Sequence, residues 1–195
     1  MNDILSGAKK YVNKILLPLE QYYYHSYYHA LEVMERAMYL AEKEWLKEEE
    51  AEILWLAGLF HDTWYIIQYD NNEYISAKIA QNFLKSILYP MEKILQVESI
   101  ILATSPYYKP QNIQEEIIKD ADLDNLWRDD FMKRNNDIRK EIEVVKNIKI
   151  KDPDWIHASV ELLKEHQFRT KSQRRERDKK RIDNLNMLEE KLSSK

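Results

Sequence analysis

The chain has 195 residues, 44% of them hydrophobic, with two glycines, five prolines, no cysteine and a formal net charge of −4. So few turn-forming residues exclude a many-stranded sandwich or barrel, and the length suits one compact domain, so we expect an all-α, single-domain bundle. The lack of cysteine excludes disulfides, thiolate metal sites and a cysteine nucleophile, and the negative charge argues against nucleic acid as a partner.

Four helices are predicted in the first half of the chain, after an N-terminal helical segment. Apolar residues recur there at the spacing of an amphipathic helix, or form a run long enough for a buried one. Asn71 and Asn72 can cap the third helix, and Pro90 suits the first turn of the fourth. Two prolines in residues 105–110 end that helix. The predicted ranges are 1–20 for the N-terminal segment, then 27–44, 47–60, 73–88 and 90–104.

The second half is predicted to contain more polar helices. One over 113–120 precedes a carboxylate-rich stretch, a charged one follows near 135–149, and Asp152-Pro153 begins the next. From residue 164 on there are 11 Lys or Arg against 6 Asp or Glu, compared with 19 against 28 before it. The last helix, from about Ser172, is so polar that we expect it on the surface or at a partner.

Two pairs of residues are candidates for metal binding. His25 and His29 stand four residues apart, so both imidazoles project from one face if the helix includes His25. The alternative is that both are merely partly buried polar side chains. His61 and Asp62 end an eight-residue apolar run, where a cation would offset the cost of burying a carboxylate. Here the alternative is a helix end satisfied by ordinary hydrogen bonds.

A third segment holds three carboxylates, Asp120, Asp122 and Asp124. An EF-hand loop starting at the first of them would need glycine at its sixth position and glutamate at its twelfth, which are Asn125 and Phe131. The H-E-x-x-H pattern of zincin proteases and the glycine-rich phosphate-binding loops are also absent from the sequence. A calcium loop and a zincin site are therefore excluded, and NTP-driven chemistry is not expected.

In chain order, His29, His61-Asp62 and Asp122 form the pattern H…HD…D that names the HD superfamily of helical phosphohydrolases, which this chain resembles. Residues 24–33 are similar to the Y-H-N-x-x-H-A-x-D-V signature of cyclic nucleotide phosphodiesterases. Further blocks resemble small bacterial predicted HD phosphohydrolases. These blocks are L-F-H-D-T at 59–63, E-x-x-S-A at 73–77 and D-A-D-L at 120–123.

The resemblance implies an HD-type helical bundle with a metal site in its core. Its expected parts are the N-terminal segment 1–20, an HD-domain core at 21–150 and C-terminal helices at 151–195 that pack on the core or extend from it. By the same resemblance, the metal ligands are His29, His61, Asp62 and Asp122. They would bind a divalent cation whose identity among Mn, Mg, Fe, Co, Ni and Zn is open. One ion is favoured over two, since Asn72 stands where the small relatives often have histidine.

The resemblance also implies roles around the metal. His25 matches the general acid of the phosphodiesterases, and Asp62 is the candidate bridge if two ions bind. We expect Glu73 or Asp120 to orient the proton donor or the attacking water. A first-turn glutamate that merely favours the helix dipole is an equal alternative for Glu73. Side chains expected to contact the substrate, because they lie near the loops that should border the site, are Thr104, Lys109 and Arg128.

The implied function is hydrolysis of a phosphate ester by metal-activated water, with a nucleotide or cyclic nucleotide as the expected substrate class. The alternative is a noncatalytic, metal-stabilised ligand-binding or scaffolding protein. A small phosphorylated metabolite is the expected partner, and a homodimer through the C-terminal helices is a further candidate. Without a membrane-spanning apolar run or an apolar N-terminal leader, the expected location is the cytoplasm.

Overall fold

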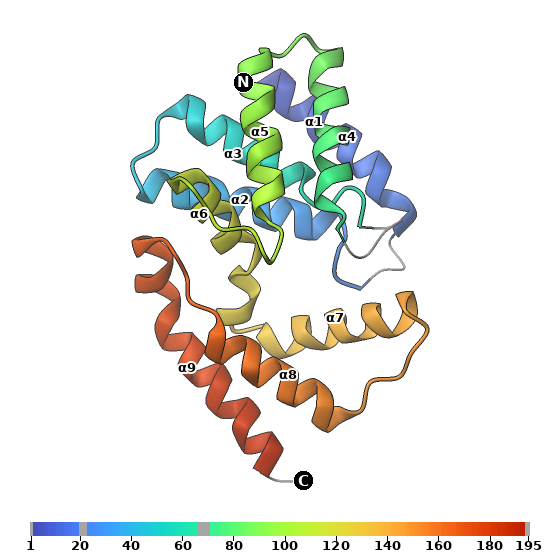
Figure 1. Ribbon diagram of the computed structural model, residues 1–195, viewed down its shortest axis with the longest axis vertical. Coiled ribbons are helices and arrows are strands. Elements are labelled where there is room, and N and C mark those ends of the chain that lie inside the picture. The colour runs from blue at the N-terminus through green and yellow to red at the C-terminus, as the bar shows by residue number, and fades with distance from the viewer. Residues whose placement is uncertain (1, 20–22, 66–70, 194–195) are drawn as a thin grey trace.

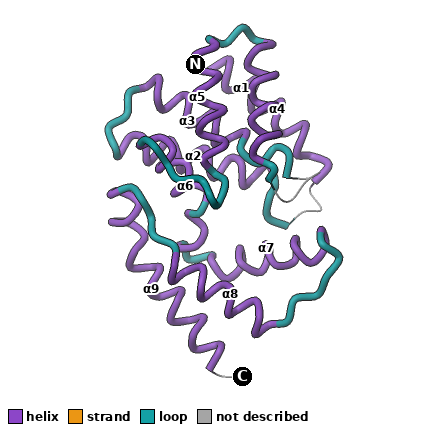
Figure 2. Tube along the Cα trace, viewed as in Figure 1, coloured by secondary structure: helices purple, strands orange, loops and turns teal. Residues whose placement is uncertain are grey.

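The computed structural model describes residues 2–19, 23–65 and 71–193, and every regular element in those ranges is a helix (Figures 1 and 2). The predicted all-α fold is therefore confirmed. The elements are α1 (Asn2–Leu16), the 3-10 helix η1 (Leu17–Leu19), α2 (Tyr27–Lys43), α3 (Glu48–Phe60), α4 (Glu73–Ser86), α5 (Met91–Ala103), α6 (Ile113–Asp122), the 3-10 helix η2 (Asp124–Trp127), α7 (Phe131–Val145), α8 (Asp152–Glu165) and α9 (Lys171–Ser193). Within the described ranges, no helix is long and apolar enough to cross a membrane.

Two hydrophobic clusters hold the helices together. The larger one is built from α1 to α6, with α3 near its centre. The smaller one joins η2 and α7 to α8 and α9, and it is drawn below the larger in Figure 1. Its buried members are Leu126, Trp127, Phe131, Val160, Leu163, Phe168 and Leu188. Ala121 belongs to the larger cluster and Leu123 packs against the smaller one, so the clusters meet close to Asp122. The expected boundaries of the HD-domain core, at residues 20 and 150, stay predictions.

Helix α3 is buried along its whole second half, since every residue from Ile53 to Phe60 is buried. Gly58 lies against α2 so closely that a Cβ atom there would come within 2.9 Å of the Cα atom of Met34. Glycine therefore permits the close approach of α2 and α3. This approach brings the end of α3, where His61 follows, beside the first turns of α2.

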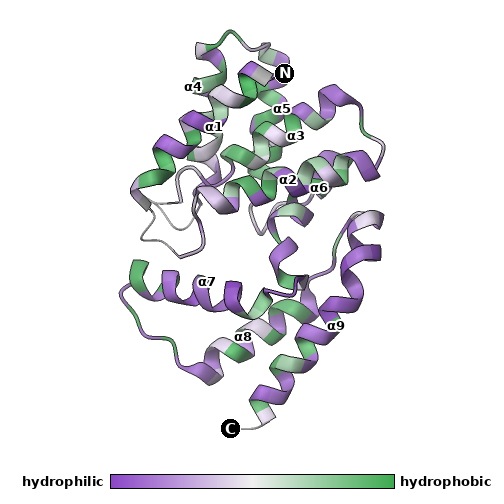
Figure 3. Ribbon diagram, turned by 180° about the vertical axis from the view of Figure 1, so that it is seen from behind, coloured by the Kyte–Doolittle hydropathy of each residue, from purple (hydrophilic) through white to green (hydrophobic). Residues whose placement is uncertain are grey.

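The polarity of the helices follows their burial. In Figure 3, hydrophobic residues lie mainly on the inward faces of α2, α3 and α5, whereas α9 is largely hydrophilic. Leu188 of α9 is fully buried in the smaller cluster, and Ile182 is 52% exposed. Helix α9 therefore packs against the smaller cluster of the same chain. The homodimer through the C-terminal helices remains a prediction.

Some helix ends differ from the prediction. Helix α2 begins at Tyr27 with Ser26 as an extended N-cap, so His25 precedes the helix and the condition for a helix face shared with His29 is not met. Asn72 occupies the N-cap position of α4 but makes no capping bond with its side chain. Helix α7 begins at Phe131, before the expected residue 135, and it ends before Asn147, which adopts a positive φ of 49°.

Candidate metal centre

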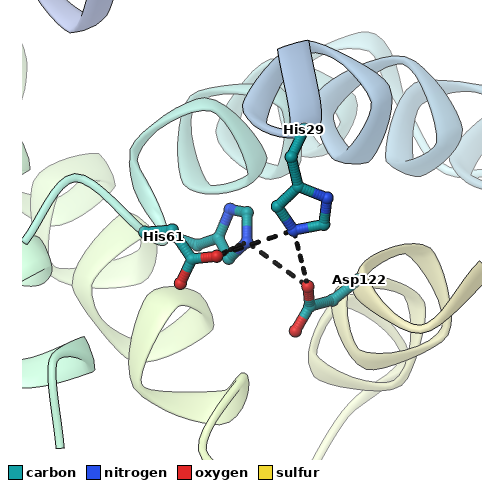
Figure 4. A group of neighbouring side chains, drawn as sticks. His29, His61 and Asp122 are labelled. Atoms are coloured by element: carbon teal, nitrogen blue, oxygen red, sulfur yellow. Dashed lines mark hydrogen bonds and ion pairs between the residues drawn. The ribbon is translucent and has the colours of Figure 1, made fainter. Parts of the chain in front are cut away.

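Four side chains from three parts of the chain meet at one point. His29 lies in the first turn of α2, His61 and Asp62 follow α3, and Asp122 is the last residue of α6. Each offers one ligand atom, and these atoms all lie within 4.8 Å of one another. Figure 4 shows the side chains of His29, His61 and Asp122 pointing toward a common centre. The three helix ends thus assemble the group that the sequence motifs predicted.

The distances within this group are short. The Nε2 atom of His29 lies 3.2 Å from Oδ1 of Asp122 and 3.5 Å from Oδ2 of Asp62. The Nε2 atom of His61 lies 2.9 Å from the same Asp62 oxygen and 3.3 Å from the same Asp122 oxygen. Two imidazole nitrogens and two carboxylate oxygens therefore face each other.

Burial and charge act in opposite directions on these groups. Burial alone would lower the pKa of His61, but the charges of Asp62 and Asp122 outweigh it and raise that pKa well above its ordinary value. Burial would raise the pKa of Asp62, yet the charge of His61 holds it well below its usual range. The pKa of Asp122 is lowered for the same reason. Two carboxylates therefore stay ionised in a buried site that attracts positive charge.

The orientation of His61 tests whether a metal fits. Its Nδ1 atom lies 2.7 Å from the carbonyl oxygen of Gly58, an acceptor that holds a proton on Nδ1, so the neutral imidazole that binds a metal carries its lone pair on Nε2. That Nε2 atom is buried and lacks a hydrogen bond of suitable geometry to any residue of the described ranges. A divalent cation satisfies this lone pair and the two carboxylates together, because imidazole and carboxylate are the ligands that Mn, Fe, Co, Ni and Zn accept. The residues fit a metal.

A family comparison agrees with this arrangement. The model of the HD domain matches residues 26–124, a range that contains all four residues of the group. The chain belongs to the HD-domain family. This membership supports a metal-dependent phosphohydrolase in general terms and confirms the predicted superfamily.

Solved structures share the HD-domain fold over almost the whole chain. Bacillus subtilis YpgQ in complex with ADP is 20% identical, with a TM-score of 0.67 over 97% of this chain and 95% of that chain. The Lin1889 protein from Listeria innocua is 21% identical, with a TM-score of 0.68 over 98% of this chain and 97% of that one. No curated protein sequence matches the chain. The structural likeness shows that the fold extends through the C-terminal helices.

We call the group of His29, His61, Asp62 and Asp122 the HD centre. His25 lies beside this centre and is held from two sides. Its Nε2 atom is 4.0 Å from Oδ2 of Asp62, and its Nδ1 atom pairs with Oε1 of Glu141. The ring of Tyr65 stacks on the imidazole, with 3.5 Å between the ring centroids. The second oxygen of Glu141 accepts the backbone N–H groups of Tyr24 and His25, at 2.8 and 2.9 Å. The imidazole is thereby fixed with Nε2 toward the centre, as a proton donor requires.

Glu141 is a partner of His25 that the sequence does not predict. It lies in α7, a helix rich in charged residues, yet it is fully buried. Burial would raise its pKa, but the hydrogen bond and charge of His25 lower it, so the carboxylate stays ionised. No local signal separates Glu141 from the exposed acids of the same helix, because its partner lies 116 residues away in the sequence.

Asn72 also contributes to the HD centre. It is buried, and its Nδ2 atom donates to Oδ1 of Asp62 at 3.3 Å, which explains why its side chain does not cap α4. The amide occupies one oxygen of Asp62 while the other oxygen faces the two histidines. The Asn72 amide therefore orients the Asp62 carboxylate, whereas a histidine at this position would itself be a further metal ligand.

The expected role of Asp120 is wrong. Its carboxylate accepts the backbone N–H groups of Arg169 and Thr170 and the hydroxyl of Thr170, at 2.8 to 3.1 Å. Asp120 and Asp122 stand two positions apart on α6, so their side chains point to different sides of the helix. Asp120 therefore faces the C-terminal segment instead of His25 or the attacking water.

Three other expected residues do not hydrogen-bond to the HD centre within the described ranges. Glu73 begins α4, and its charge acts on Lys119, whose pKa is lowered chiefly by burial. The hydroxyl of Thr104 donates to the carbonyl oxygen of Ile101 at the end of α5, and Lys109 is exposed. Glu73 therefore fits the helix-dipole alternative, and the expected contacts of Thr104 and Lys109 with the substrate stay predictions.

Arg128 does border the HD centre. It lines a small hollow together with Tyr24, His29, Glu32 and Asp122. Its guanidinium binds Asp130 with two hydrogen bonds of 2.9 Å and Glu32 with one of 3.2 Å. Glu32, which replaces the aspartate of the phosphodiesterase signature, thus anchors an arginine at the edge of the site.

Proposed function

We propose that the protein hydrolyses a phosphate ester of a nucleotide or cyclic nucleotide, using a divalent cation bound by His29, His61, Asp62 and Asp122. The observation that carries this proposal is the convergence of two imidazoles and two ionised carboxylates on one point, with Nε2 of His25 directed at them. One cation is favoured, since Asn72 offers an amide where a second metal would need a stronger ligand.

The reaction divides between the cation and the protein. A divalent cation, when bound, polarises a phosphoryl oxygen and activates water. His25 supplies the proton for the leaving oxygen: the imidazolium gives up its Nε2 proton and becomes neutral, while Glu141 keeps the other proton on Nδ1. The aromatic ring of Tyr65 prevents the imidazole from turning away.

Support for a nucleotide comes from two sources. Residues 24–33 resemble the phosphodiesterase signature, in which the histidine that matches His25 is the general acid. YpgQ, which shares the fold at 20% identity, has been crystallised in complex with ADP. Arg128 and the neighbouring Arg134, which pairs with the same Glu32 and Asp130, are the candidate contacts for the anionic part of such a substrate, because planar guanidinium groups suit phosphate oxygens.

The test is phosphate release from a panel of nucleotides and cyclic nucleotides with Mn²⁺, Mg²⁺, Co²⁺ or Fe²⁺ added. We expect turnover with at least one cation, and background rates for Asp62→Ala and His29→Ala. Asp129→Ala is the matched control, because this exposed carboxylate pairs with Lys180 on the outer surface, and it should leave the rate unchanged. Full activity in Asp62→Ala would reject the proposal. Tight metal binding without turnover on any substrate would favour the noncatalytic alternative.

A further inference from the structure

The residues on either side of Asp122 are held by one C-terminal segment. Asp120 and Asp124 stand two positions before and after this ligand, and both are buried, at 0% and 6% exposure. Their carboxylates are bound mainly from residues 169–177, which lie beyond the end of the HD match at residue 124. In Figure 1 the first turn of α9 accordingly lies next to the end of α6.

The contact on the Asp120 side centres on Thr170. Its hydroxyl and its backbone N–H both lie 2.8 Å from Oδ2 of Asp120, and the backbone N–H of Arg169 lies 2.9 Å from Oδ1. The hydroxyl of Thr170 also accepts the backbone N–H of Gln173, as an N-cap side chain does. The positive end of α9 therefore meets the Asp120 carboxylate, which favours the contact.

The contact on the Asp124 side centres on Gln173 and Arg177. The guanidinium of Arg177 binds both oxygens of Asp124, at 2.8 and 3.0 Å, and Nε2 of Gln173 donates to Oδ1 at 2.8 Å. The same nitrogen of Gln173 reaches the backbone carbonyl oxygen of Asp120 at 3.4 Å. Arg36 of α2 completes the contact, with its Nε atom 3.1 Å from Asp124. Gln173, which is fully buried, thus joins both flanks of Asp122.

We propose that Thr170, Gln173 and Arg177 are positioning residues that fix the metal ligand Asp122 through its two flanking carboxylates. Asp122 ends α6, where the helical hydrogen bonds run out, and its side chain is 23% exposed, the largest value among the four ligands. Without support, this end of the helix would fray and the carboxylate would lose its place. The inference rests on the proposed metal site and adds that the site depends on residues outside the family match.

The test is a titration of the metal-free full-length protein with Mn²⁺, in which electron paramagnetic resonance reports the free ion. Residues that hydrogen-bond a metal ligand directly typically change metal affinity 10- to 100-fold. Thr170 and Gln173 act one contact further away, through Asp120 and Asp124, so we expect the dissociation constant to rise by about 10-fold, the lower end of this range, in Thr170→Val and in Gln173→Leu. Thr170→Ser, which keeps the hydroxyl, should restore affinity close to that of the wild type. Arg177→Met removes only a partly exposed contact and provides a milder variant if the buried ones fail to fold.

The matched control is Asn184→Leu. Asn184 is a buried amide on the same helix, but it donates to the backbone carbonyl oxygens of Leu126 and Arg128 and does not touch either flank of Asp122. It should lower thermal stability without changing Mn²⁺ affinity. Unchanged affinity in Thr170→Val and Gln173→Leu, or an equal loss in Asn184→Leu, would overturn the positioning role alone. Wild-type protein that binds no Mn²⁺, or Asp122→Ala protein that binds it normally, would overturn the proposed metal site together with it.

Discussion

His25 and Glu141 form a buried imidazole–carboxylate pair although 116 residues separate them in the sequence. Glu141 accepts from the ring with one oxygen and from two backbone N–H groups with the other, so a single carboxylate fixes both the imidazole and the segment that carries it. Through this pair, α7 of the smaller cluster acts on a residue that lies beside the larger one.

The first prediction concerns Glu141→Gln. The amide oxygen could still accept from Nδ1 of His25, but the amide N–H₂ group would oppose the backbone N–H groups of Tyr24 and His25. We expect kcat to fall by about 100-fold, near the lower end of what a positioned proton donor contributes, while bound metal is retained. Steady-state kinetics with metal analysis of the same samples measures both quantities.

His25→Ala provides the comparison for this prediction. It should lose turnover mainly on substrates with poor leaving groups and should keep its metal, and Glu141→Gln should show the same pattern in weaker form. A drop in bound metal that matches the drop in kcat would instead make His25 a ligand. Equal losses on good and poor leaving groups would show that the pair does not deliver a proton.

The second prediction concerns pH. Burial opposes protonation of His61, but Asp62 and Asp122 raise its pKa well above the ordinary value of about 6.5. In metal-free protein, the stability from this charged group is therefore fully present below about pH 6.5 and is lost as the pH rises through the raised pKa. Since a ligand imidazole must be neutral, metal binding should release protons in that window, and Mn²⁺ affinity should increase with pH.

Two measurements check the pH prediction. Thermal unfolding of metal-free protein should show a melting temperature that decreases as the pH rises above about 6.5. Calorimetric Mn²⁺ titrations in buffers of different ionisation enthalpy should show proton release that disappears as the pH rises through the raised pKa of His61. An affinity that is the same at acid and alkaline pH would mean that His61 does not carry a displaceable proton.

The third prediction concerns the contact between α2 and α3. A Cβ atom at Gly58 would lie 2.9 Å from the Cα atom and 3.1 Å from the backbone nitrogen of Met34, and backbone atoms cannot move aside cheaply. We expect Gly58→Ala to lower the free energy of unfolding by about 1–3 kcal/mol. We also expect weaker metal binding, because the added methyl group would push apart α2, which carries His29, and the end of α3, which His61 follows. Urea unfolding measures the first effect and Mn²⁺ titration the second.

Gly7→Ala is the control for this prediction, because a Cβ atom there would meet only the ring edge of Phe83 at 3.8 Å. It should leave both metal binding and packing unchanged. A Gly58→Ala protein with wild-type stability would show that α2 and α3 are not closely packed at this point.

The convergence of His29, His61, Asp62 and Asp122 could be predicted from the sequence because each residue lies in a short, recognisable context. His61 and Asp62 end an apolar run, and a buried helix with a polar end leaves few alternatives to a functional site. The helix ranges followed from apolar spacing for the same reason. These signals depend only on residues that are close together in the chain, so they can be recognised in a single sequence.

The supporting contacts could not be predicted, since they join polar residues that are distant in the sequence. Nothing local distinguishes Glu141 or Gln173 from the exposed polar residues around them, yet both are fully buried. Asp120 was assigned wrongly because a cluster of carboxylates does not reveal which member faces which neighbour. The helical rotation over two positions directs Asp120 and Asp122 to different sides, but only the structure identifies the partner on each side.

In the proposed function, hydrolysis depends on a cation bound at the HD centre. The most direct measurement is a Mn²⁺ titration of metal-free protein in which bound metal and phosphate release from a nucleotide are followed together. We predict that both rise in parallel and saturate at a single equivalent, and that both are lost in His61→Ala. Phosphate release at the full rate in metal-free protein, or unchanged metal binding in His61→Ala, would contradict metal-dependent hydrolysis at this centre.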